Sequence, residues 1–520
     1  MNDLTPPRPA RSGGRAARRA MRAAPLAQAQ RPVNPGLEGG TLKVLSDAEV
    51  ARIHDAALRC LEEIGLADAP PSGIELLTGA GAILGDDGRI RFPRALVEDM
   101  LAKAARGIRL CGRDPAFDLD LSGTRVHYGT AGAAVHMVDV EGNAYRESTL
   151  RDLHDAARLT DQLDNIHFFQ RPMVARDVTD NREMDYNTVY ASVSGTRKHI
   201  GTSIVEPDHV PEILEMLHMM AGSEEAWRAR PFVSNSNCFV VPPMKFATES
   251  CEVMEACIRG GMPVLLLSAG MAGATAPSTL AGAIVQATAE CLAGVVYVNA
   301  LAPGHPAIFG TWPFGLDLRT GAMSIGSGEQ ALLSAGCAQM HQFYGLPGGA
   351  AGGASDSKLP DMQAGWEQMC SNVMAGLSGL NMVYEAAGMH ASLLGFCFES
   401  LVMGDDLVGQ ALRCVRGIEV NDDTLAVETI RQAVLGPDGT GGPGHYLGTE
   451  QTLERMEKDF VYPRLGDRTS PKEWDENGKP DLVEKAVART KELLAAPCEA
   501  ALDPATDAAI RDRFNIHLSR

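Results

Sequence analysis

The chain has 520 residues, a formal net charge of −19, 45% apolar residues and 22% charged residues. This composition provides for a large buried core and excludes a chain that is disordered throughout. The length corresponds to roughly two to four domains, or to one α/β barrel with additions. Residues 1–40 carry seven Arg against Asp3 and Glu38, a local +5 that leaves −24 on the remainder. So acidic a remainder excludes nucleic acid and anionic membranes as main partners, because both are bound through basic side chains.

The first forty residues are rich in Pro, Arg, Gly and Ala, which predicts a disordered basic tail over residues 1–40. A transit peptide is the alternative interpretation of this start, whereas no apolar run long enough for a secretory signal follows Arg18 and Arg19. The uncharged stretch 262–289 contains Pro263, Pro277 and several Gly, so we expect a buried strand, a loop and a helix there rather than a membrane span. These features predict a cytoplasmic protein.

The eleven cysteines form no Cys-x-x-Cys pair and no paired Cys/His spacing. Their odd number and their apolar surroundings predict buried, reduced thiols, as in a cytosolic protein. We therefore expect no metal centre, although a zinc site assembled from distant residues is an open alternative. The cysteines are Cys60, Cys111, Cys238, Cys251, Cys257, Cys291, Cys337, Cys370, Cys397, Cys414 and Cys498.

The first predicted element is a helix over residues 47–64. Ser46 and Glu49 form a capping-box pattern at its start, and Gly65 ends it. The chain is then mixed and turn-rich up to residue 150, which predicts a helical and β N-terminal extension over residues 41–150 that packs on the rest. Two short strands and a hairpin turn are expected in it, at 89–92, 124–128 and 141–143.

From residue 150 onward, short apolar strands alternate with helices, which predicts βαβ units and a parallel sheet. About eight such units over about 250 residues predict a (β/α)8 TIM barrel over residues 151–420. An open doubly wound sheet is the alternative; it favours a Gly-rich phosphate turn, and Ser268–Gly273 is too irregular for one. Residues 421–520 are predicted to form a charged helical C-terminal segment. The expected strands are 166–169, 199–204, 232–237, 264–268, 307–311, 346–351, 381–385 and 393–398, and the expected helices are 183–194, 208–221, 245–260, 278–296, 326–344, 360–376 and 403–416.

Candidate site residues follow the predicted strands, because barrel enzymes place their sites at the carboxyl ends of the strands. Amides, hydroxyls, aromatic rings and a few carboxylates occur there, which suits a small cationic or zwitterionic ligand better than a phosphate ester. Glu329, Glu385 and Glu399 lie in apolar segments, where a carboxylate needs a partner or a cationic ligand. The other candidates are Asn235, Asn237, Phe309, Trp312, Asp356, Lys358, His390 and Phe396.

Several of these candidates also have a purely structural interpretation. Asn235 and Asn237 are typical of turns and are able to satisfy loop backbone only. Trp312 precedes a proline and is equally typical of a packing residue. Asp356 stands before a predicted helix start, and His390 has the surroundings of a satisfied buried histidine.

Several strings of residues together resemble the trimethylamine methyltransferase family of corrinoid-protein methyltransferases. The resemblance covers roughly residues 42–475, and the combination is more specific than any one string. The strings are Ser194–His199, Asp317–Gly321, Asp356–Gly365, Gly444–Thr452 and Tyr462–Arg468.

The resemblance implies a (β/α)8 barrel that moves a methyl group from an amine to the cobalt of a separate corrinoid protein. Methylamine enzymes of this family carry pyrrolysine in the barrel mouth, whereas this sequence has only standard residues. It is therefore more similar to the branch without pyrrolysine, which demethylates quaternary amines such as glycine betaine. A quaternary ammonium already has a neutral amine as its leaving group, so its demethylation requires neither pyrrolysine nor a Lewis-acid metal. Trimethylamine is the less favoured substrate.

The corrinoid is expected on a partner protein. Corrinoid carriers in this chemistry bear an Asp-x-His-x-x-Gly motif, and the nearest string here, Asp152–Ala157, lacks the Gly and lies in an apparent amphipathic helix. We therefore expect this chain to bind no cofactor of its own, and its cobalamin-bearing partner to cap the barrel mouth. A homo-oligomer is also expected.

The resemblance and the chemistry together suggest roles for the candidate residues. We assign Asp356, Glu329 and His390 to catalysis, with the two carboxylates setting the electric field around the cation. The aromatic rings of Tyr128, Phe309, Trp312 and Phe396 are assigned to cation–π contacts with the substrate. A carboxylate on the substrate is expected to bind Asn235, Asn237, Lys358 or His390. No residue is assigned to a metal.

Two other functions remain open on the sequence alone. One is a different small-molecule barrel enzyme, such as a metal-dependent lyase or hydrolase. The other is a non-catalytic betaine-binding barrel that lost the chemistry.

Overall fold

The computed structural model describes residues 31–519, except for the side chain of Asn237. The basic tail predicted for residues 1–40 lies outside the described residues as far as residue 30. The chain forms two compact units, which we name the body and the arm. The body comprises Pro35–Ile418 and the chain from Pro463 onward, and the arm is Glu419–Tyr462, grouped with the chain before Pro35.

The body begins with a helix that ends as predicted at Gly65. Helix α2 (Asp47–Arg59) starts at a capping box formed by Ser46 and Glu49, and it continues as the π-helical turn η2 (Cys60–Ile64). Gly65 then takes a φ of +67°, a conformation that side chains with a Cβ rarely adopt. The elements that follow are α3 (Pro71–Gly79), β2 (Ile83–Leu84), β3 (Ile90–Arg91), α4 (Arg94–Lys103), β4 (Arg109–Leu110), η3 (Pro115–Phe117) and β5 (Leu119–Asp120).

The main sheet of the body has nine strands, of which eight are parallel. The ninth, β1, pairs antiparallel with β6. The sheet is curled, because its two outermost parallel strands, β6 and β9, also meet: the N–H of His167 donates to the carbonyl of Tyr128 at 2.6 Å, and Gly129 bridges to Phe168. In sheet order the strands are β1 (Leu37–Glu38), β6 (Arg125–Tyr128), β17 (Met382–Tyr384), β16 (Gly348–Ala351), β13 (Ala307–Thr311), β12 (Val264–Ser268), β11 (Val233–Asn237), β10 (His199–Thr202) and β9 (Phe168–Gln170).

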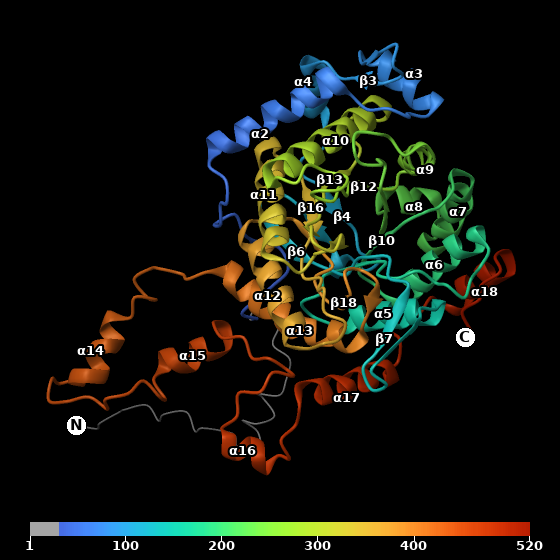
Figure 1. The fold of residues 1–520 in the computed structure, drawn as a ribbon. Coiled ribbons are helices and arrows are strands. Elements are labelled where there is room, and N and C mark those ends of the chain that lie inside the picture. Colours follow the sequence, from blue (N-terminus) through green and yellow to red (C-terminus); the bar gives the residue numbers. More distant parts are fainter. Residues whose placement is uncertain (1–30, 520) are drawn as a thin grey trace, which may run out of the picture. The chain divides into compact units, whose positions relative to one another are not determined.

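Helices connect and cover these strands, and Figure 1 shows α10, α11, α12 and α13 around β6, β13 and β16. Among the described residues one helix, α10, is long and apolar enough to cross a membrane, and 83% of its apolar stretch is buried. The helices are α5 (Leu150–Gln162), α6 (Asn181–Gly195), η4 (Pro207–His209), α7 (Val210–Ala221), α8 (Glu224–Ala229), α9 (Thr248–Arg259), α10 (Leu280–Leu301), α11 (Gly328–Tyr344), α12 (Met362–Leu377) and α13 (Phe398–Arg416).

The predicted strand at 393–398 is wrong as a member of the main sheet. Its core, β19 (Gly395–Phe396), belongs to a separate four-stranded sheet with β18 (Met389–His390), β7 (His136–Asp139) and β8 (Ala144–Glu147). The eighth parallel strand is instead β6, which the sequence placed in the N-terminal extension. The main sheet therefore begins before residue 150, because β6, within the predicted extension, pairs with β17 of that sheet. A short apolar run shows that a strand forms but not which sheet it joins, and this explains the error.

The C-terminal segment predicted over 421–520 divides between the two units. Helices α14 (Val427–Leu435) and α15 (Glu450–Lys458) belong to the arm, and α16 (Pro471–Glu476), α17 (Leu482–Ala495) and α18 (Pro504–Arg513) belong to the body. The return to the body is fixed by Asp406 on α13, whose carboxylate accepts hydrogen bonds from the backbone N–H groups of Arg464, Leu465 and Gly466 at 2.7–3.1 Å.

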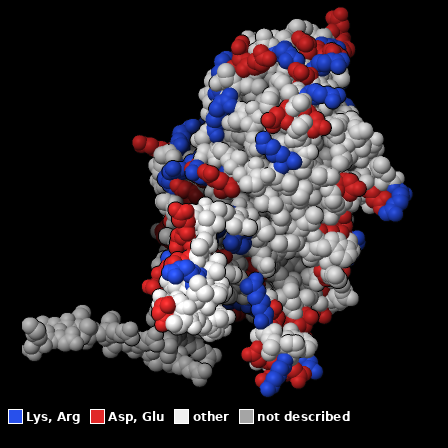
Figure 2. Space-filling view, turned by 90° about the vertical axis from the view of Figure 1, so that its left-hand side faces the viewer, with Lys and Arg blue, Asp and Glu red and all other residues white. Residues whose placement is uncertain are grey.

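Figure 2 shows Lys and Arg interspersed with Asp and Glu over one face of the molecule, with uncharged areas between them. This face carries no broad basic surface, which agrees with the acidic composition.

Candidate functional site

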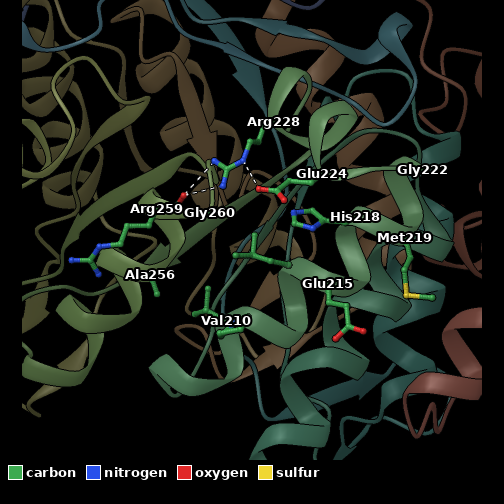
Figure 3. Close-up of a pocket in the computed structure, with 12 residues that line it drawn as sticks. Val210, Glu215, His218, Met219, Gly222, Glu224, Arg228, Ala256, Arg259 and Gly260 are labelled. Atoms are coloured by element: carbon green, nitrogen blue, oxygen red, sulfur yellow. Dashed lines mark hydrogen bonds and ion pairs between the residues drawn. The ribbon is translucent and has the colours of Figure 1, made fainter.

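A groove of about 750 Å³ lies among the outer helices, lined by residues of α7, α8 and α9 (Figure 3). Its charged groups already have partners. Arg228 donates to Glu224 at 2.8 Å and to the carbonyl of Arg259 at 3.3 Å, and Glu215 pairs with Arg513, outside the lining, at 2.9 Å. The groove lies on the helix layer and not at the strand ends, where α/β enzymes bind their ligands.

The strands of the main sheet present two different faces. On one face, the ring of Phe309 packs against Tyr344 of α11 at 5.6 Å, and the hydroxyl of Tyr128 donates to the carbonyl of Asn372 on α12 at 2.9 Å. This face therefore meets the helices. Residues in register on neighbouring parallel strands share a face, and alternate residues along a strand point to opposite faces. The residues next to Phe309 and Tyr128 consequently belong to the other, inner face.

Three aromatic rings from separate strands meet on the inner face. The ring of Tyr384 lies 5.1 Å from Phe168 and 5.0 Å from Trp312, and all three are buried. None of the three comes from neighbouring strands, since β6 separates β9 from β17 and β16 separates β17 from β13. We name Phe168, Trp312 and Tyr384 the aromatic cluster. Tyr384 ends β17 and Trp312 directly follows β13, whereas Phe168 is the first residue of β9. Two of the three rings therefore lie at the carboxyl ends of their strands, where barrel and other α/β enzymes bind their ligands.

Glycines on the inner face make room for these rings. A Cβ at Gly129 would lie 2.4 Å from the ring of Phe168, and one at Gly349 would lie 2.6 Å from the ring of Tyr384. A Cβ at Gly201 would overlap the amide of Gln170 at 1.5 Å, which places this amide on the inner face as well. These contacts explain why the strands carry so many small residues.

Glu385 directly follows Tyr384 and is the outstanding polar group of this region. It is only 1% exposed, and neither of its carboxylate oxygens has a hydrogen-bond donor among the described residues. Burial raises the pKa of Glu385 to about 8. Its φ of +60° is unusual for a residue with a side chain, and such strain concentrates at functional positions.

The aromatic cluster contains a second unsatisfied group: the indole N–H of Trp312 is buried and has no acceptor within residues 31–519. A buried carboxylate and a buried donor are both costly when unpaired. The carboxyl end of β17 thus brings together a buried carboxylate, which directly follows Tyr384 in the chain, and three rings with one indole donor on the inner face. This arrangement suits a small alkylammonium ligand.

Asp356, predicted to be catalytic, has its hydrogen-bonding capacity taken up by the protein itself. Its carboxylate accepts from the N–H groups of Ile325 and Gly326 at 3.0 and 3.1 Å and from the hydroxyl of Ser392 at 2.7 Å. It therefore ties the segment after the small hairpin β14 (Leu316–Asp317) and β15 (Ala322–Met323) to the segment between β18 and β19. We name these two connected segments, residues 324–326 and 391–394, the roof loops.

The other predicted polar residues lie in varied environments. His390 is buried, with its Nε2 2.6 Å from the hydroxyl of Ser400, and burial lowers its pKa to about 4, so it is neutral. Lys358 is exposed and donates to the carbonyl of Asp356 at 2.7 Å. Glu329 is exposed in the first turn of α11, so its carboxylate does not need the partner or cationic ligand that its apolar segment suggested.

Asn235 is buried, and its register with Val264 places it on the helix-facing side of β11, with its side-chain oxygen lacking a donor among the described residues. Asn237 ends β11, and its side chain lies outside the described part of the chain.

The predicted aromatic residues do not form one group. Trp312 belongs to the aromatic cluster. Tyr128 and Phe309 face α12 and α11, so their prediction as ligand contacts conflicts with their orientation. Phe396 is fully buried in β19, where its ring contacts Phe398 at 6.4 Å. Strand alternation offered a signal for this division, because Phe309 and Trp312 are three residues apart and cannot share a face.

Sequence reasoning missed Phe168, Gln170 and Tyr384, and it noted Glu385 only as a carboxylate in need of a partner. Nothing in the local sequence distinguishes these residues from ordinary core residues. Their grouping depends on contacts between strands far apart in the chain.

The motif Ser194–His199 supports the opposite ends of the strands. Lys198 is buried, and its ammonium donates to the carbonyls of Thr160 and Leu163, both at 2.6 Å, at the end of α5. Burial lowers its pKa to about 8. His199 contacts the carbonyl of Cys111 at 2.8 Å. This motif is therefore part of the scaffold and not of the site.

Within residues 31–519, no group of three or more His, Cys, Asp or Glu side chains is arranged to hold a metal ion. The cysteines are only partly as predicted. Six of the eleven are buried, whereas Cys238, Cys370 and Cys414 are exposed.

Comparison with known proteins gives consistent results. The model of the family described as trimethylamine methyltransferase (MTTB) matches residues 11–516. The chain is 30% identical to trimethylamine methyltransferase MttB of Desulfitobacterium hafniense, over 88% of this chain and 90% of that protein. It is 28% identical to glycine betaine methyltransferase of the same species, over 90% of this chain and 95% of that protein. Among solved structures, the hydroxylamine complex of MtmB matches 89% of this chain and 96% of its own, at 11% identity and a TM-score of 0.47, too distant a likeness to add to the argument.

Proposed function

Since the chain belongs to the trimethylamine methyltransferase family and is a methyltransferase, we propose that it demethylates a small quaternary ammonium compound of the glycine betaine type. The methyl acceptor is the cobalt(I) corrinoid of a separate protein. The observation that carries this proposal is Glu385, a buried carboxylate that has no donor among the described residues and that directly follows Tyr384 of the aromatic cluster.

Glu385 and the aromatic cluster complement each other as a cation site. A quaternary ammonium has no N–H to donate, so it is recognised by charge and by the faces of aromatic rings. The positive charge of the substrate compensates the buried carboxylate, which would otherwise be protonated near neutral pH because its pKa is about 8. Trimethylammonium groups fill space between rings that a hydrated ion does not.

The placement of the site supports the proposal that the eight parallel strands close into a (β/α)8 barrel. The contacts between β6 and β9 bring the two outermost parallel strands together. In such a barrel the carboxyl ends of β13 and β17, with Trp312, Tyr384 and Glu385, would open at the mouth. The corrinoid protein would approach this mouth, because its cobalt must reach the methyl group.

In the proposed methyl transfer, the protein binds and orients the substrate but forms no covalent bond with it. The bond between nitrogen and methyl carbon breaks with its electron pair remaining on nitrogen, which gives a neutral tertiary amine. The methyl group passes to cobalt(I), whose electron pair forms the new bond. The chain supplies the position of the ammonium, the exclusion of water and a charge environment that does not hold the cation too tightly, since the positive charge leaves nitrogen in the transition state. Rings are suited to this, because a cation–π contact is weaker than a buried ion pair.

Glu385 accordingly acts on binding more than on the rate of the chemical step. A carboxylate stabilises the cationic substrate at least as much as the transition state, so it lowers KM without raising kcat. We also propose a cytoplasmic location and a homo-oligomeric state for the enzyme, with no cofactor resident on this chain.

The proposal is tested by mixing the purified protein with a reduced corrinoid, free or on a carrier protein, and following methylation of cobalt by absorbance. The panel contains glycine betaine, choline, tetramethylammonium and trimethylamine. We expect turnover with at least one quaternary compound and none with trimethylamine. Turnover with trimethylamine alone, or calorimetric binding of a betaine without any methyl transfer on the carrier, contradicts the proposal. Glu98→Gln, an exposed change on α4, is the matched control for Glu385→Gln.

A further inference from the structure

The arm is a folded segment in its own right. Arg455 on α15 pairs with Asp423 and lies 3.4 Å from Asp459. Thr449 caps the start of α15, and the N–H groups of Gly441 and Gly442 close the end of α14 onto the carbonyls of Leu435 and Val434 at 2.8 and 3.0 Å. These bonds give the arm a defined shape.

This defined segment has almost no core. In the arm, which lies entirely within the described residues, Ala433 is the only hydrophobic side chain that is buried. Leu447, Val420 and Val427 are 80%, 71% and 70% exposed. The large apolar residues exposed in the arm are Val420, Leu425, Val427, Ile430, Val434, Leu435, Tyr446, Leu447, Leu453, Phe460 and Tyr462.

The extent of this surface matches that of a stable protein interface. These eleven large apolar side chains, eight of which expose more than half of their area, together present on the order of 1,000 Å². A standard interface buries about 800 Å² on each partner, and monomeric proteins rarely expose an apolar surface of this extent. We therefore expect the apolar surface of the arm to be buried against another protein surface.

A second apolar surface of the chain is also uncovered. On α12, Met362 and Trp366 are 83% and 58% exposed, and Cys370 is exposed as well. The three are spaced four residues apart and so follow one face of the helix, which we name the α12 stripe. The opposite face of α12 is buried in the body through Ala364, Gln368 and Asn372. An exposed Trp beside a Met is typical of the central anchor of an interface.

We propose that the arm of one copy of this chain covers the α12 stripe of a second copy, which makes the protein an arm-exchanged homo-oligomer. Both surfaces are carried by the same chain, so each copy supplies what its neighbour lacks, and a symmetric assembly covers both. A partner that comes and goes would leave about 1,000 Å² of apolar surface in water between encounters, whereas a second copy covers it permanently. This inference does not depend on the proposed substrate.

The first experiment measures the mass of the full-length protein by light scattering over a dilution series. We expect an oligomer for the natural sequence. Val427→Asp with Leu447→Asp in the arm, and separately Met362→Glu with Trp366→Glu on α12, should each shift the dissociation midpoint at least tenfold toward higher concentration. Ile83→Asp, a change at another exposed apolar residue far from either surface in sequence, is the matched control and should leave the midpoint unchanged. Circular dichroism verifies that each variant is folded.

A second measurement tests the pairing itself. In a background in which Cys238 and Cys414 are replaced by Ser, one chain carries Leu447→Cys with Cys370→Ser and another keeps Cys370. A bismaleimide should link the two different chains between positions 447 and 370, and peptide mapping identifies the link. A monomeric natural protein, an oligomer insensitive to both pairs of substitutions, or the absence of a link between the two different chains would overturn the proposal. Variants that remain oligomeric but no longer react with the corrinoid protein would also overturn it, because they would assign these surfaces to the acceptor.

Discussion

Two carboxylates, Asp356 and Glu385, follow neighbouring strands of the main sheet, but they differ in the hydrogen bonds that they accept. Asp356 accepts hydrogen bonds from two backbone N–H groups and the hydroxyl of Ser392. Glu385 is almost fully buried and accepts none from the described residues. The first stands in a string that resembles a family motif, and the second stands in no such string. The comparison indicates that a motif residue can serve the scaffold, while the residue that awaits a ligand is recognised by what it lacks.

The largest expected effect comes from removing the charge of Glu385. Glu385→Gln keeps the shape of the side chain but leaves the ammonium of the substrate without a counter-charge, at a cost of about 3 kcal/mol and thus roughly a 100-fold weaker affinity. Titration calorimetry with glycine betaine measures this without an acceptor protein. In turnover we expect KM to rise by a similar factor and kcat to change little. A loss confined to kcat would assign Glu385 to the chemical step instead.

The pH dependence of binding should follow from the same group. The cation binds the ionised form of Glu385, whose pKa in the free site is about 8, so the proton must leave when the substrate binds. Affinity should therefore rise about tenfold per pH unit below pH 8 and level off above it. Calorimetry in buffers of different ionisation heat should detect the released proton. The Glu385→Gln variant should show a flat profile, and a flat profile in the natural protein would contradict the proposed role.

Asp356 should respond differently, with stability affected before binding. Asp356→Asn places an amide group beside the N–H groups of Ile325 and Gly326 and weakens the bonds that connect the roof loops, at a cost of about 2 kcal/mol in the free energy of unfolding. Hydrogen exchange should become faster at residues 324–326 and 391–394, while the affinity for glycine betaine should change less than threefold. A large loss of affinity with undisturbed exchange would return Asp356 to the role that the sequence suggested.

The sequence predicted most of the framework and only part of the site. The strands at 264–268 and 307–311 have the predicted bounds, and α10 through α13 lie where expected, because these segments combine long apolar periodicity with clear start and stop signals. The strand β6 was recognised but assigned to the extension, since its partner β17 lies some 250 residues further along the chain. The sequence marked Glu385 as a carboxylate in need of a partner. Only the folded core shows that no described residue supplies that partner. The sequence of the arm does not predict that its apolar side chains are exposed either, because its composition resembles that of an ordinary helical segment.

The smallest expected effect separates the two faces of β13. Phe309 packs against α11, so Phe309→Leu should lower the stability of the protein by about 1 kcal/mol through lost packing and leave substrate affinity unchanged. Trp312, three residues later, contacts Tyr384 on the inner face, so Trp312→Leu should weaken binding of tetramethylammonium about tenfold, the size of a desolvated cation–π contact. Both are aromatic-to-Leu changes in buried positions, so the pair controls for loss of ring volume. Thermal unfolding gives the first effect and calorimetry the second. If the two variants bind equally well, the aromatic cluster is a packing feature and the cation site must be sought around Glu385 alone.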